Sequence, residues 1–342
     1  KTLRTEKERH KEGQVIINTL CSYIRSSFNL ASKTEDLSRD QTPEDYEGGD
    51  QQFTKDRAKL REEKELRLAI LEAIKNRLND GTNKLSKGLW SDFDYDFSNA
   101  YFFYPIGFTN SYFGASSKFS GATFIENADF SRTAFTERAP FSGATFTQEA
   151  NFSKAEFAED ADFSGAKFTE DADFSGATFT QEANFSGATF TQEAEFSWAT
   201  FTQEADFSWA TFTQEANFFW ATFTQEAEFS WATFTKNATF YGVTFTQEAD
   251  FSGATFTLNT NFSKATFQTT PIFEYTLNNE TYKARFSYKT DPEDYNFEVS
   301  PDSLYKIETR EQEHNGVKFI IPKDAVLFDP DDPFVWAEPA GG

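Results

Sequence analysis

The sequence predicts an all-β solenoid with a helical segment before it and a small β-rich cap after it. Phenylalanine recurs at alternating intervals of five and six residues, without a miss, from Phe97 to Phe273. In the best-kept unit, Ala183 to Glu193, an alanine stands two residues before each phenylalanine, and Ser or Thr follows it. The unit therefore consists of two pentapeptides, A-N-F-S-G and A-T-F-T-Q, and one extra Glu.

The eleven-residue period is compatible with either helical or extended chain. A right-handed helical coiled coil has this period, but Thr, Ser, Gly and Phe are poor helix formers. In an extended chain, residues i and i−2 point to the same side. Ala and Phe then point inwards together, and the Thr or Asn between them points outwards. We expect the phenylalanine rings to be buried, because a long row of exposed rings would promote aggregation.

The size of the side chains predicts the cross-section of the solenoid. A coil of eleven residues is too thin to enclose two rings and two alanines, whereas a four-sided coil of about 22 residues has room for four of each. Equivalent residues of successive coils then stack at about 4.8 Å, the spacing of paired strands. We therefore expect residues 91–273 to form a quadrilateral β-helix of about eight coils and about 39 Å.

Residues 1–90 are expected to form a helical segment that caps the first coil. The first helix is predicted from apolar residues at helical spacing, namely Val15–Ile17, Leu20, Tyr23 and Ile24. Gly13 lies near its start. Residues 31–54, with Pro43 and two glycines, predict a loop. A second helix is predicted from about Lys55 to Leu78, with Gly81 as its left-handed cap. Its expected apolar face is Leu60, Leu66, Leu68, Ile70, Leu71, Ile74 and Leu78.

Residues 274–342 are expected to form a small β-rich cap with an extended end. Lys318–Ile321 and Val326–Phe328 are strand-like runs, and several prolines interrupt the segment. The open ends of a solenoid expose unpaired strand edges. The segments before and after the repeat are placed to cover these edges.

The motif A-[DN]-F-[ST]-G resembles the signature of pentapeptide-repeat proteins, and the alternating five and six spacing is similar to a large bacterial subgroup. Residues 19–25 (T-L-C-S-Y-I-R), the helix from Leu66 to Leu78 and residues 90–94 (W-S-D-F-D) resemble the helical segment that precedes the repeats in many members. The resemblance covers about residues 14–273. It implies a right-handed quadrilateral β-helix, and most of the family has no assigned biochemical function.

The resemblance also bears on location. In such members a membrane-anchoring region often precedes the helical segment, and this chain starts at Lys1 rather than at Met. We expect a fragment or processed form from the cytoplasm, or from the cytoplasmic face of a bacterial membrane. No run within the sequence approaches the roughly 18 apolar residues of a membrane-spanning helix, so any membrane contact is expected through a segment that is absent here.

Composition argues against several classes of function. The net charge of −23 and the pI near 4.5 exclude ordinary nucleic-acid binding, which needs a basic surface. A single cysteine, Cys21, excludes a disulfide framework, and only His10 and His314 supply imidazole. We expect no catalytic residues, no cofactor and no metal, and therefore no enzyme; the sequence does not predict whether a small-molecule ligand binds.

The candidate interaction surface consists of two sets of outward residues. Tryptophan takes the place two residues after Phe, where Gly is usual, at Trp198, Trp209, Trp220 and Trp231. A coil of about 22 residues would stack Trp198 on Trp220, and Trp209 on Trp231 across the rod. Exposed indoles suit a sugar or a protein partner. Duplication of one Trp-containing unit, with stacking of its rings, explains the same pattern.

The second set consists of the inserted glutamates, Glu182, Glu204 and Glu226, with a parallel column at Glu193 and Glu215. Acidic residues just before Phe add to it. Like charges one coil apart repel, so we expect some carboxylate pKa values to rise. These columns suit mimicry of a polyanion, binding of a divalent cation or simply a solvated surface. Stacked Thr-x-Thr rows resemble the ice-binding face of some antifreeze solenoids, but the neighbouring Gln-Glu columns spoil such a surface.

These observations lead to three hypotheses of function. The first is a non-enzymatic scaffold that binds a protein partner or another copy of itself. The second is an acidic DNA mimic that binds a topoisomerase or another DNA-binding protein, as some members of the family do, although those members keep a strict five-residue period. The third is a carbohydrate-binding rod that uses the exposed tryptophans.

Overall fold

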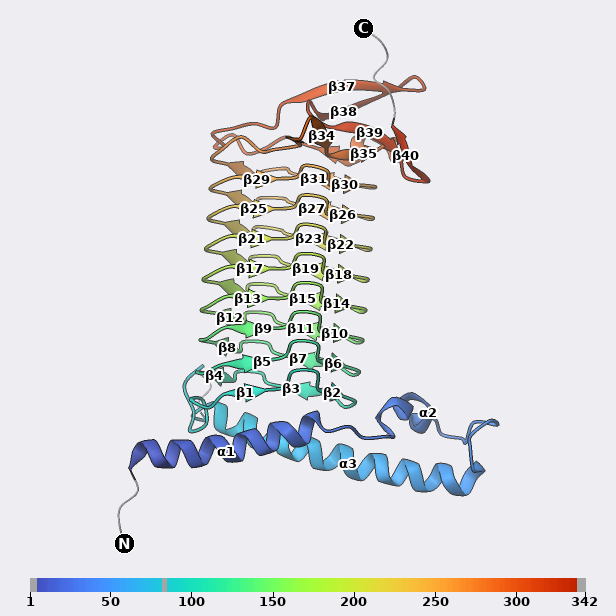
Figure 1. Ribbon diagram of the computed structural model, residues 1–342. Coiled ribbons are helices and arrows are strands. Elements are labelled where there is room, and N and C mark those ends of the chain that lie inside the picture. The colour runs from blue at the N-terminus through green and yellow to red at the C-terminus, as the bar shows by residue number, and fades with distance from the viewer. Residues whose placement is uncertain (1–4, 82–84, 337–342) are drawn as a thin grey trace.

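The chain forms a straight rod of stacked coils, with helices across one end and further strands across the other (Figure 1). The computed structural model describes residues 5–81 and 85–336. The expected extended end at residues 337–342 lies outside the described residues. The predicted all-β solenoid, with helices before it and a small β-rich cap after it, is confirmed.

Four sides of the rod, which we call faces I to IV in chain order, each consist of one short strand per coil. Face I contains β2 (Tyr101–Phe102), β6 (Thr123–Phe124), β10 (Thr145–Phe146), β14 (Lys167–Phe168), β18 (Thr189–Phe190), β22 (Thr211–Phe212), β26 (Thr233–Phe234) and β30 (Thr255–Phe256). Face II contains β3 (Ile106–Gly107), β7 (Ala128–Asp129), β11 (Ala150–Asn151), β15 (Ala172–Asp173), β19 (Ala194–Glu195), β23 (Ala216–Asn217), β27 (Ala238–Thr239) and β31 (Thr260–Asn261).

Faces III and IV complete each coil. Face III contains β4 (Tyr112–Phe113), β8 (Ala134–Phe135), β12 (Glu156–Phe157), β16 (Thr178–Phe179), β20 (Thr200–Phe201), β24 (Thr222–Phe223), β28 (Thr244–Phe245) and β32 (Thr266–Phe267). Face IV contains β1 (Tyr95–Asp96), β5 (Ser117–Lys118), β9 (Ala139–Pro140), β13 (Ala161–Asp162), β17 (Ala183–Asn184), β21 (Ala205–Asp206), β25 (Ala227–Glu228) and β29 (Ala249–Asp250).

Successive strands within a face pair in parallel with a register shift of one coil, except that β5 and β9 of face IV belong to separate sheets. Thr178 pairs with Thr200 and Phe179 with Phe201, which gives the predicted period of 22 residues. The face III sheet is eight-stranded, in agreement with about eight coils. The backbone hydrogen bonds run along the rod, as from the Thr178 amide to the Ala155 carbonyl at 2.9 Å. The sides of the rod therefore pair their own backbone groups.

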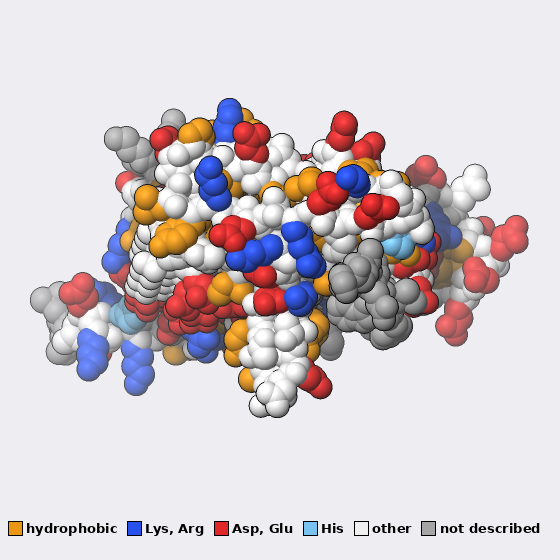
Figure 2. All heavy atoms as spheres, turned by 90° about the horizontal axis from the view of Figure 1, so that it is seen from above, with side chains coloured by type: hydrophobic (Ala, Val, Ile, Leu, Met, Phe, Trp, Pro, Cys, Tyr) orange, Lys and Arg blue, Asp and Glu red, His pale blue; other side chains and the backbone are white. Residues whose placement is uncertain are grey.

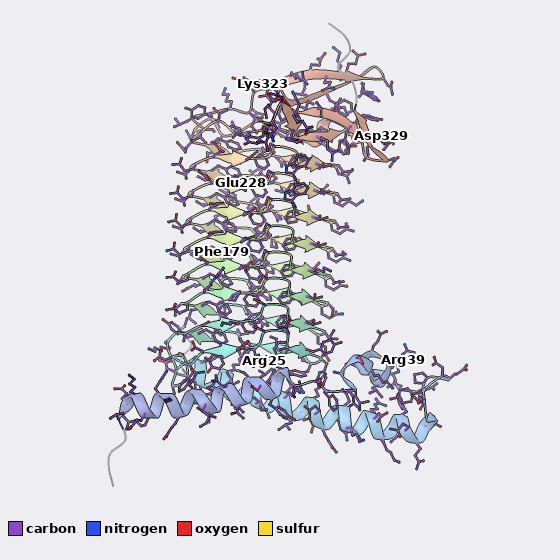
Figure 3. All side chains as sticks on the ribbon, viewed as in Figure 1. Arg25, Arg39, Phe179, Glu228, Lys323 and Asp329 are labelled. Carbon is purple, nitrogen blue, oxygen red and sulfur yellow. The ribbon has the colours of Figure 1, made fainter. Side chains whose placement is uncertain are left out.

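Stacked phenylalanine rings fill the interior. Every Phe of the ladder from Phe97 to Phe273 is buried, as are nearly all of the alanines two residues before them. The Phe179 ring, which Figure 3 labels, lies 4.9 Å from that of Phe157 and 4.8 Å from that of Phe201, and the planes differ by 2° in both pairs. Within the coil it meets Phe185 edge-on, at 5.8 Å and 82°. Parallel stacks along the rod and edge contacts across it thus form one continuous core.

The N-terminal segment crosses the open end of the first coil (Figure 1). It contains α1 (Glu6–Arg25), the 3-10 turn η1 (Ala31–Lys33), α2 (Thr34–Ser38) and α3 (Gly49–Leu78). The predicted loop at 31–54 is therefore wrong in part, because two short helical elements and the start of α3 lie within it. α1 also begins earlier than expected, because Thr5 caps it in a reciprocal pair of hydrogen bonds with Glu8. Gly81 is left-handed, as predicted, with φ of 79°.

The predicted apolar faces of the helices need three corrections. Leu66, Val15 and Ile16 are exposed, and none of them faces the core. On α3, Arg67 is buried in place of Leu66; its guanidinium pairs with Glu63 at 2.7 Å and donates to the Ile24 carbonyl at 2.7 Å. Sequence periodicity missed this residue because a buried arginine with its donors satisfied looks like a surface residue in a helical pattern.

The regular phenylalanine spacing ends at Phe273, as expected, but strands of the C-terminal segment continue to pair on the rod. β35 (Arg285–Ser287) and then β39 (Val326–Asp329) continue face I in parallel, and β36 (Tyr295–Asn296) continues face II. Phe286 stacks on Phe256 at 4.9 Å. The remaining elements are the hairpin β33 (Glu274–Leu277) with β34 (Glu280–Lys283), η2 (Pro292–Asp294), the antiparallel pair β37 (Thr309–His314) and β38 (Val317–Pro322), and β40 (Asp332–Trp336).

Removal of one ring from the middle of the stack should be costly. We expect Phe179→Ala to lower the free energy of unfolding by about 3–5 kcal/mol, because the cavity lies between rings that the register holds apart. Urea unfolding followed by far-ultraviolet circular dichroism measures the change. Thr178→Ala, on the outward side of the same strand, is the matched control and should cost less than about 1 kcal/mol. A loss at Phe179 no larger than at Thr178 would contradict the stacked core.

Candidate interaction surface

The four predicted tryptophans lie at two opposite corners of the rod. Trp198 and Trp220 follow face II strands and form the column at the corner between faces II and III, which we call corner II–III. Trp209 and Trp231 follow face IV strands and form the column at corner IV–I. Trp198, Trp209 and Trp220 are exposed, by 61%, 62% and 39% of their surface, and Trp231 is half-buried. The expected outward direction is confirmed.

Each tryptophan adopts a backbone conformation that favours glycine. Their φ angles lie between 55° and 61°, the left-handed region. Glycine, asparagine, lysine or arginine takes this turn position in other coils, with the same positive φ. A bulky side chain there costs roughly 1–2 kcal/mol relative to the right-handed conformation, so the backbone disfavours tryptophan at all four positions. The sequence pattern showed the substitution for Gly but not this conformation.

The predicted stacking within both columns is confirmed. The rings of Trp198 and Trp220 are 5.8 Å apart at 16°, and those of Trp209 and Trp231 are 5.0 Å apart at 5°. Each indole thus covers one face of its neighbour. A sugar that stacks on an aromatic residue needs a free ring face, so the columns offer fewer such platforms than four separate indoles would.

Corner II–III carries two further aromatic residues that sequence reasoning did not select. Phe219 and Tyr241 take the place of the serine that usually follows the buried Phe, and their rings stack at 5.2 Å. The Trp220 ring meets Tyr241 at 6.1 Å, and the Lys264 ammonium lies 5.1 Å from the Tyr241 ring. The signal was present in the sequence, as two breaks in the Ser column beside a Trp.

The predicted glutamate columns lie at the other two corners. Glu182, Glu204 and Glu226 are exposed at corner III–IV, and Glu193 and Glu215 occupy corner I–II. Seen along the rod axis, acidic side chains are superposed along one flank of the molecule (Figure 2). Residues 1–90 contain 18 Lys and Arg against 16 Asp and Glu, whereas residues 91–342 contain 14 against 39. The negative charge of the chain thus belongs to the rod and its C-terminal cap.

The carboxylates just before each buried Phe also have a local structural role. On face IV, Asp206 accepts a hydrogen bond from the Ser208 amide at 2.8 Å, and Asp250 from the Ser252 amide at 2.7 Å. This side chain-to-backbone bond holds the turn at corner IV–I. The turn alone therefore favours Asp or Asn at this position, whether or not a ligand binds.

Glu228 stands between these two aspartates and differs from them. Its carboxylate accepts a long hydrogen bond from the Ser230 hydroxyl, at 3.4 Å. Burial, followed by the charges of Asp250, Asp206, Glu204 and Glu248, raises the pKa of the Glu228 carboxyl to about 7. The pKa values of Glu193 and Glu204 are also raised, mainly by burial and then by neighbouring carboxylates. The predicted rise of some carboxylate pKa values is confirmed in direction, but burial and not the expected repulsion is its largest cause.

The residues with ordinary catalytic or metal-binding potential lie far apart. His10 stacks on Phe93 at the helical end, and His314 stacks on Tyr288 in the C-terminal cap. Cys21 is buried, and this burial raises the pKa of its thiol to about 11. Within residues 5–81 and 85–336, no group of three His, Cys, Asp or Glu side chains is arranged to hold a metal ion. None of the described helices is long and apolar enough to span a bilayer.

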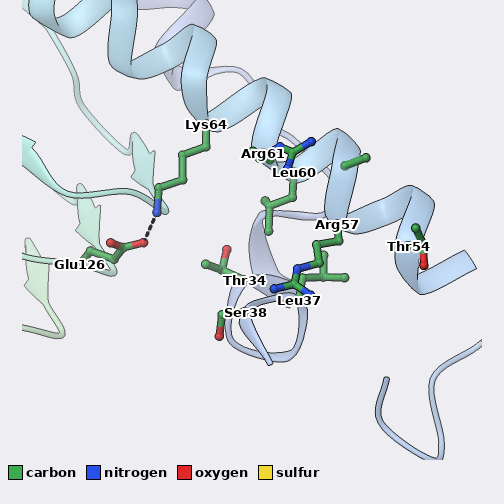
Figure 4. A pocket seen from close by; sticks show the side chains of 10 residues that line it. Thr34, Leu37, Ser38, Thr54, Arg57, Leu60, Arg61, Lys64 and Glu126 are labelled. Atoms are coloured by element: carbon green, nitrogen blue, oxygen red, sulfur yellow. Dashed lines mark hydrogen bonds and ion pairs between the residues drawn. The ribbon is translucent and has the colours of Figure 1, made fainter. Parts of the chain in front are cut away.

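A groove of about 510 Å³ lies between α2, α3 and the flank of the rod (Figure 4). Its lining includes the buried Leu37 and Leu60 and the basic side chains of Arg57, Arg61 and Lys64. The Lys64 ammonium already pairs with Glu126 of the rod at 2.6 Å. The sequence did not predict this groove, because α2 lies in the segment expected to be a loop.

Comparison with known families agrees with the geometry of the rod. The family model described as pentapeptide repeats, in nine copies, matches residues 108–156, 152–197, 220–255 and 232–276. No curated protein and no solved structure matches the chain.

Because the tryptophans have left-handed backbone conformations, glycine should stabilise the protein more than alanine at these positions, the reverse of the order in a strand. We expect Trp209→Gly to have a free energy of unfolding about 1 kcal/mol higher than Trp209→Ala, because both lose the stack on Trp231 but only Ala keeps a Cβ at positive φ. Thermal or urea unfolding of the two variants measures the difference. At Thr211, in a strand, the order of Gly and Ala should reverse. The same order at both positions would contradict the strained turn.

The raised pKa of Glu228 predicts that its ionisation destabilises the rod. The pKa of the Glu228 carboxyl is about 7 in the folded protein and 4.5 in the unfolded chain, so folding favours its protonated form. The stability that the protonated carboxyl contributes is fully present below about pH 4.5 and is lost as the pH rises through 7. We expect Glu228→Gln to stabilise the protein by about 1–2 kcal/mol at pH 8, after allowance for solvent screening, and by almost nothing near pH 4.5.

Urea titrations of wild type and variant across this pH range measure the difference. Glu195→Gln, at the equivalent position of face II, is the matched control. The Glu195 carboxylate accepts from the Asn217 side-chain amide at 2.9 Å instead of facing two carboxylates. We expect no comparable gain there. A gain from Glu228→Gln that is equal at pH 5 and pH 8 would contradict the claim that ionisation of Glu228 destabilises the rod.

Proposed function

Because the chain belongs to the pentapeptide-repeat proteins, we propose that it is a non-enzymatic scaffold that binds a protein partner, or a second copy of itself, along the side of its rod. The rod is rigid in the sense that ring stacks and backbone hydrogen bonds connect every coil to the next. Its ends are covered by α1 to α3 and by the C-terminal strands. The long sides are the surface that such a rod offers to another macromolecule.

The exposed tryptophans in left-handed turns are the observation on which this proposal rests. The turn accepts Gly, Asn or Lys elsewhere along the rod, so folding does not require tryptophan there. Large indoles held outward on a fixed backbone are typical anchors of protein interfaces, since they bury much area and lose little entropy. Backbone strain that folding does not need is often retained for function.

The other two hypotheses have weaker support. Stacking of the indoles on each other reduces the ring faces that a carbohydrate could use. Mimicry of DNA has the acidic flank in its favour, but aspartates of face IV such as Asp206 and Asp250 also serve to hold turns. A supercoiling assay with a topoisomerase separates this hypothesis from a general scaffold, because a DNA mimic inhibits the enzyme.

A variant with all four tryptophans replaced by glycine tests the proposal. Glycine is the usual residue of the turn, so we expect the variant to keep the circular dichroism spectrum and the cooperative unfolding of the wild type. Association should be lost, whether it is self-association measured by light scattering over a concentration series or capture of a partner by the immobilised protein. The proposal is wrong if the wild type does not self-associate and if the folded variant captures every protein that the wild type captures.

A further inference from the structure

The two tryptophan columns differ at their lower ends, nearer the helical cap. Below Trp209, corner IV–I consists of Gly143, Gly165 and Gly187, and no atom lies within 4 Å of the place where a side chain would start at any of them. One face of the Trp209 ring stacks on Trp231, and the space on the side of Gly187 is open. At corner II–III, the Lys154 Cγ lies 3.4 Å from the place where a side chain would start at the equivalent Gly176, so part of that space is occupied.

The columns also differ at their upper ends. At corner IV–I of the last coils, ten residues, Glu274 to Lys283, replace the two residues that connect Phe to Ala in the other coils. These residues form the β33–β34 hairpin. Its Tyr282 ring meets Trp231 at 4.9 Å and 61°. Gly253 makes this possible, because a Cβ there would meet the Trp231 ring at 2.8 Å.

The hairpin extends the column with more exposed apolar surface. Tyr275 pairs with Tyr282 across the hairpin, so both side chains lie on the same face of the ribbon as Leu277. Tyr275 and Leu277 are exposed by 51% and 50%. The apolar strip therefore runs from the open face of Trp209, through Trp231 and Tyr282, to the hairpin. We call it the corner IV–I strip.

Acidic residues border the tryptophans of this strip on the side of face IV, and Glu280 lies on the same face of the hairpin as Leu277. Asp206 and Glu228 each precede a tryptophan of the strip by three residues, and Asp250 stands at the same place one coil further. Within the described residues, none of the three has an ion pair with Lys or Arg. On the other side, face I presents Thr189, Thr211 and Thr233. A binding partner thus meets apolar surface beside uncompensated negative charge.

We propose that the corner IV–I strip, from Gly187 to the β33–β34 hairpin, binds a basic amphipathic helix of another protein. This inference rests on the proposed scaffold function and specifies its site and partner. Apolar residues of the helix would cover the open face of Trp209 and the hairpin residues Tyr275 and Leu277. Lys and Arg on the adjoining side of the helix would lie over Asp206, Glu228 and Asp250.

The backbone of the rod favours a helix over an extended segment. The strands of faces I and IV pair along the rod, so their sides present no free strand edge to which a peptide could add. A helix satisfies its own backbone hydrogen bonds, so apolar contact and complementary charge along the strip are enough to hold it. The strip spans four coil steps, from 187 to 275, or about 19 Å. A helix of about 13 residues covers that length.

Charge selects a basic partner over a second copy of this chain. Two copies facing each other with this flank would bring two sets of unpaired carboxylates together, which is unfavourable. Burial and then the neighbouring carboxylates raise the pKa of Glu228, and a cationic side chain beside it would instead favour its ionised form. We therefore expect binding to strengthen between pH 6 and pH 8, and to weaken with added salt.

Two synthetic peptides of about 15 residues test this proposal. Both are designed as amphipathic helices with the same Leu and Trp positions; one carries Lys and Arg on the adjoining side, and the other carries Glu. Titration calorimetry with the full chain should detect the basic peptide and not the acidic one. Trp209→Gly combined with Trp231→Gly should weaken binding at least tenfold, whereas Trp198→Gly combined with Trp220→Gly, at the opposite corner, should leave it within about twofold.

Further variants separate the apolar and the charged parts of the site. Gly187→Lys should also block binding, because Lys at this turn extends over the next coil as Lys154 does over Gly176. Lys154 and Lys264 show that the turn accepts lysine. Glu228→Gln should weaken binding several-fold at pH 8 and little at pH 6, whereas Glu195→Gln on face II should have no effect.

Each alternative outcome is distinct. If the basic peptide binds equally to the Trp209 and Trp198 double variants, attraction is purely electrostatic and the proposal is overturned. The proposal is also overturned if light scattering shows that the strip mediates a dimer of this chain. If the four-tryptophan variant loses association that depends on corner II–III, the scaffold function stands and this site is wrong. If no tryptophan affects any association, both the site and the proposed function fail.

Discussion

The structure depends on one constraint: every phenylalanine ring must lie above its equivalent in the preceding coil. The rings of Phe157, Phe179 and Phe201 repeat at 4.8–4.9 Å with planes within 2°, which is also the spacing of paired strands. A single inserted residue within a strand would turn Phe outwards and Thr inwards. The coil length is therefore held at 22 residues, and variation in length is confined to corners, where the β33–β34 hairpin is the example.

The same constraint explains why the coils differ from one another mainly at their corners. Two corners of each coil need a left-handed residue to turn the chain within two positions, and this conformation favours glycine. Tryptophan at four successive corners of this type works against the backbone and does not add to the buried core. The core consists mostly of Phe and Ala, with a few buried exceptions such as Thr133 and Val243. The corners accept many residue types, so a large side chain at a corner is not required for folding.

Much of the rod could be predicted because its periodicity encodes contacts directly: a fixed spacing of Phe places each ring, and the outward columns follow. The helices were predicted less well, since the burial of Arg67 depends on carbonyls at Ile24 and Ser26 that no local pattern reveals. The sequence was enough to place Trp and Glu in outward columns. It did not predict the backbone strain or the pKa shifts at these positions. The left-handed φ of Trp209 and the isolation of Glu228 among carboxylates depend on the turn geometry and on which side chains meet across coils.

The two tryptophan columns show that identical residues at identical turns need not make equivalent sites. At corner II–III, Lys154 lies against the glycine below the column, and Phe219, Tyr241 and Lys264 add contacts within the corner itself. At corner IV–I, the glycines below leave an indole face open, and the hairpin above adds apolar surface that the regular repeat does not contain. Since the scaffold is the same at both corners, any difference in their binding must come from these neighbours. A repeat protein thus acquires a specific surface through the few positions at which its repeat is broken.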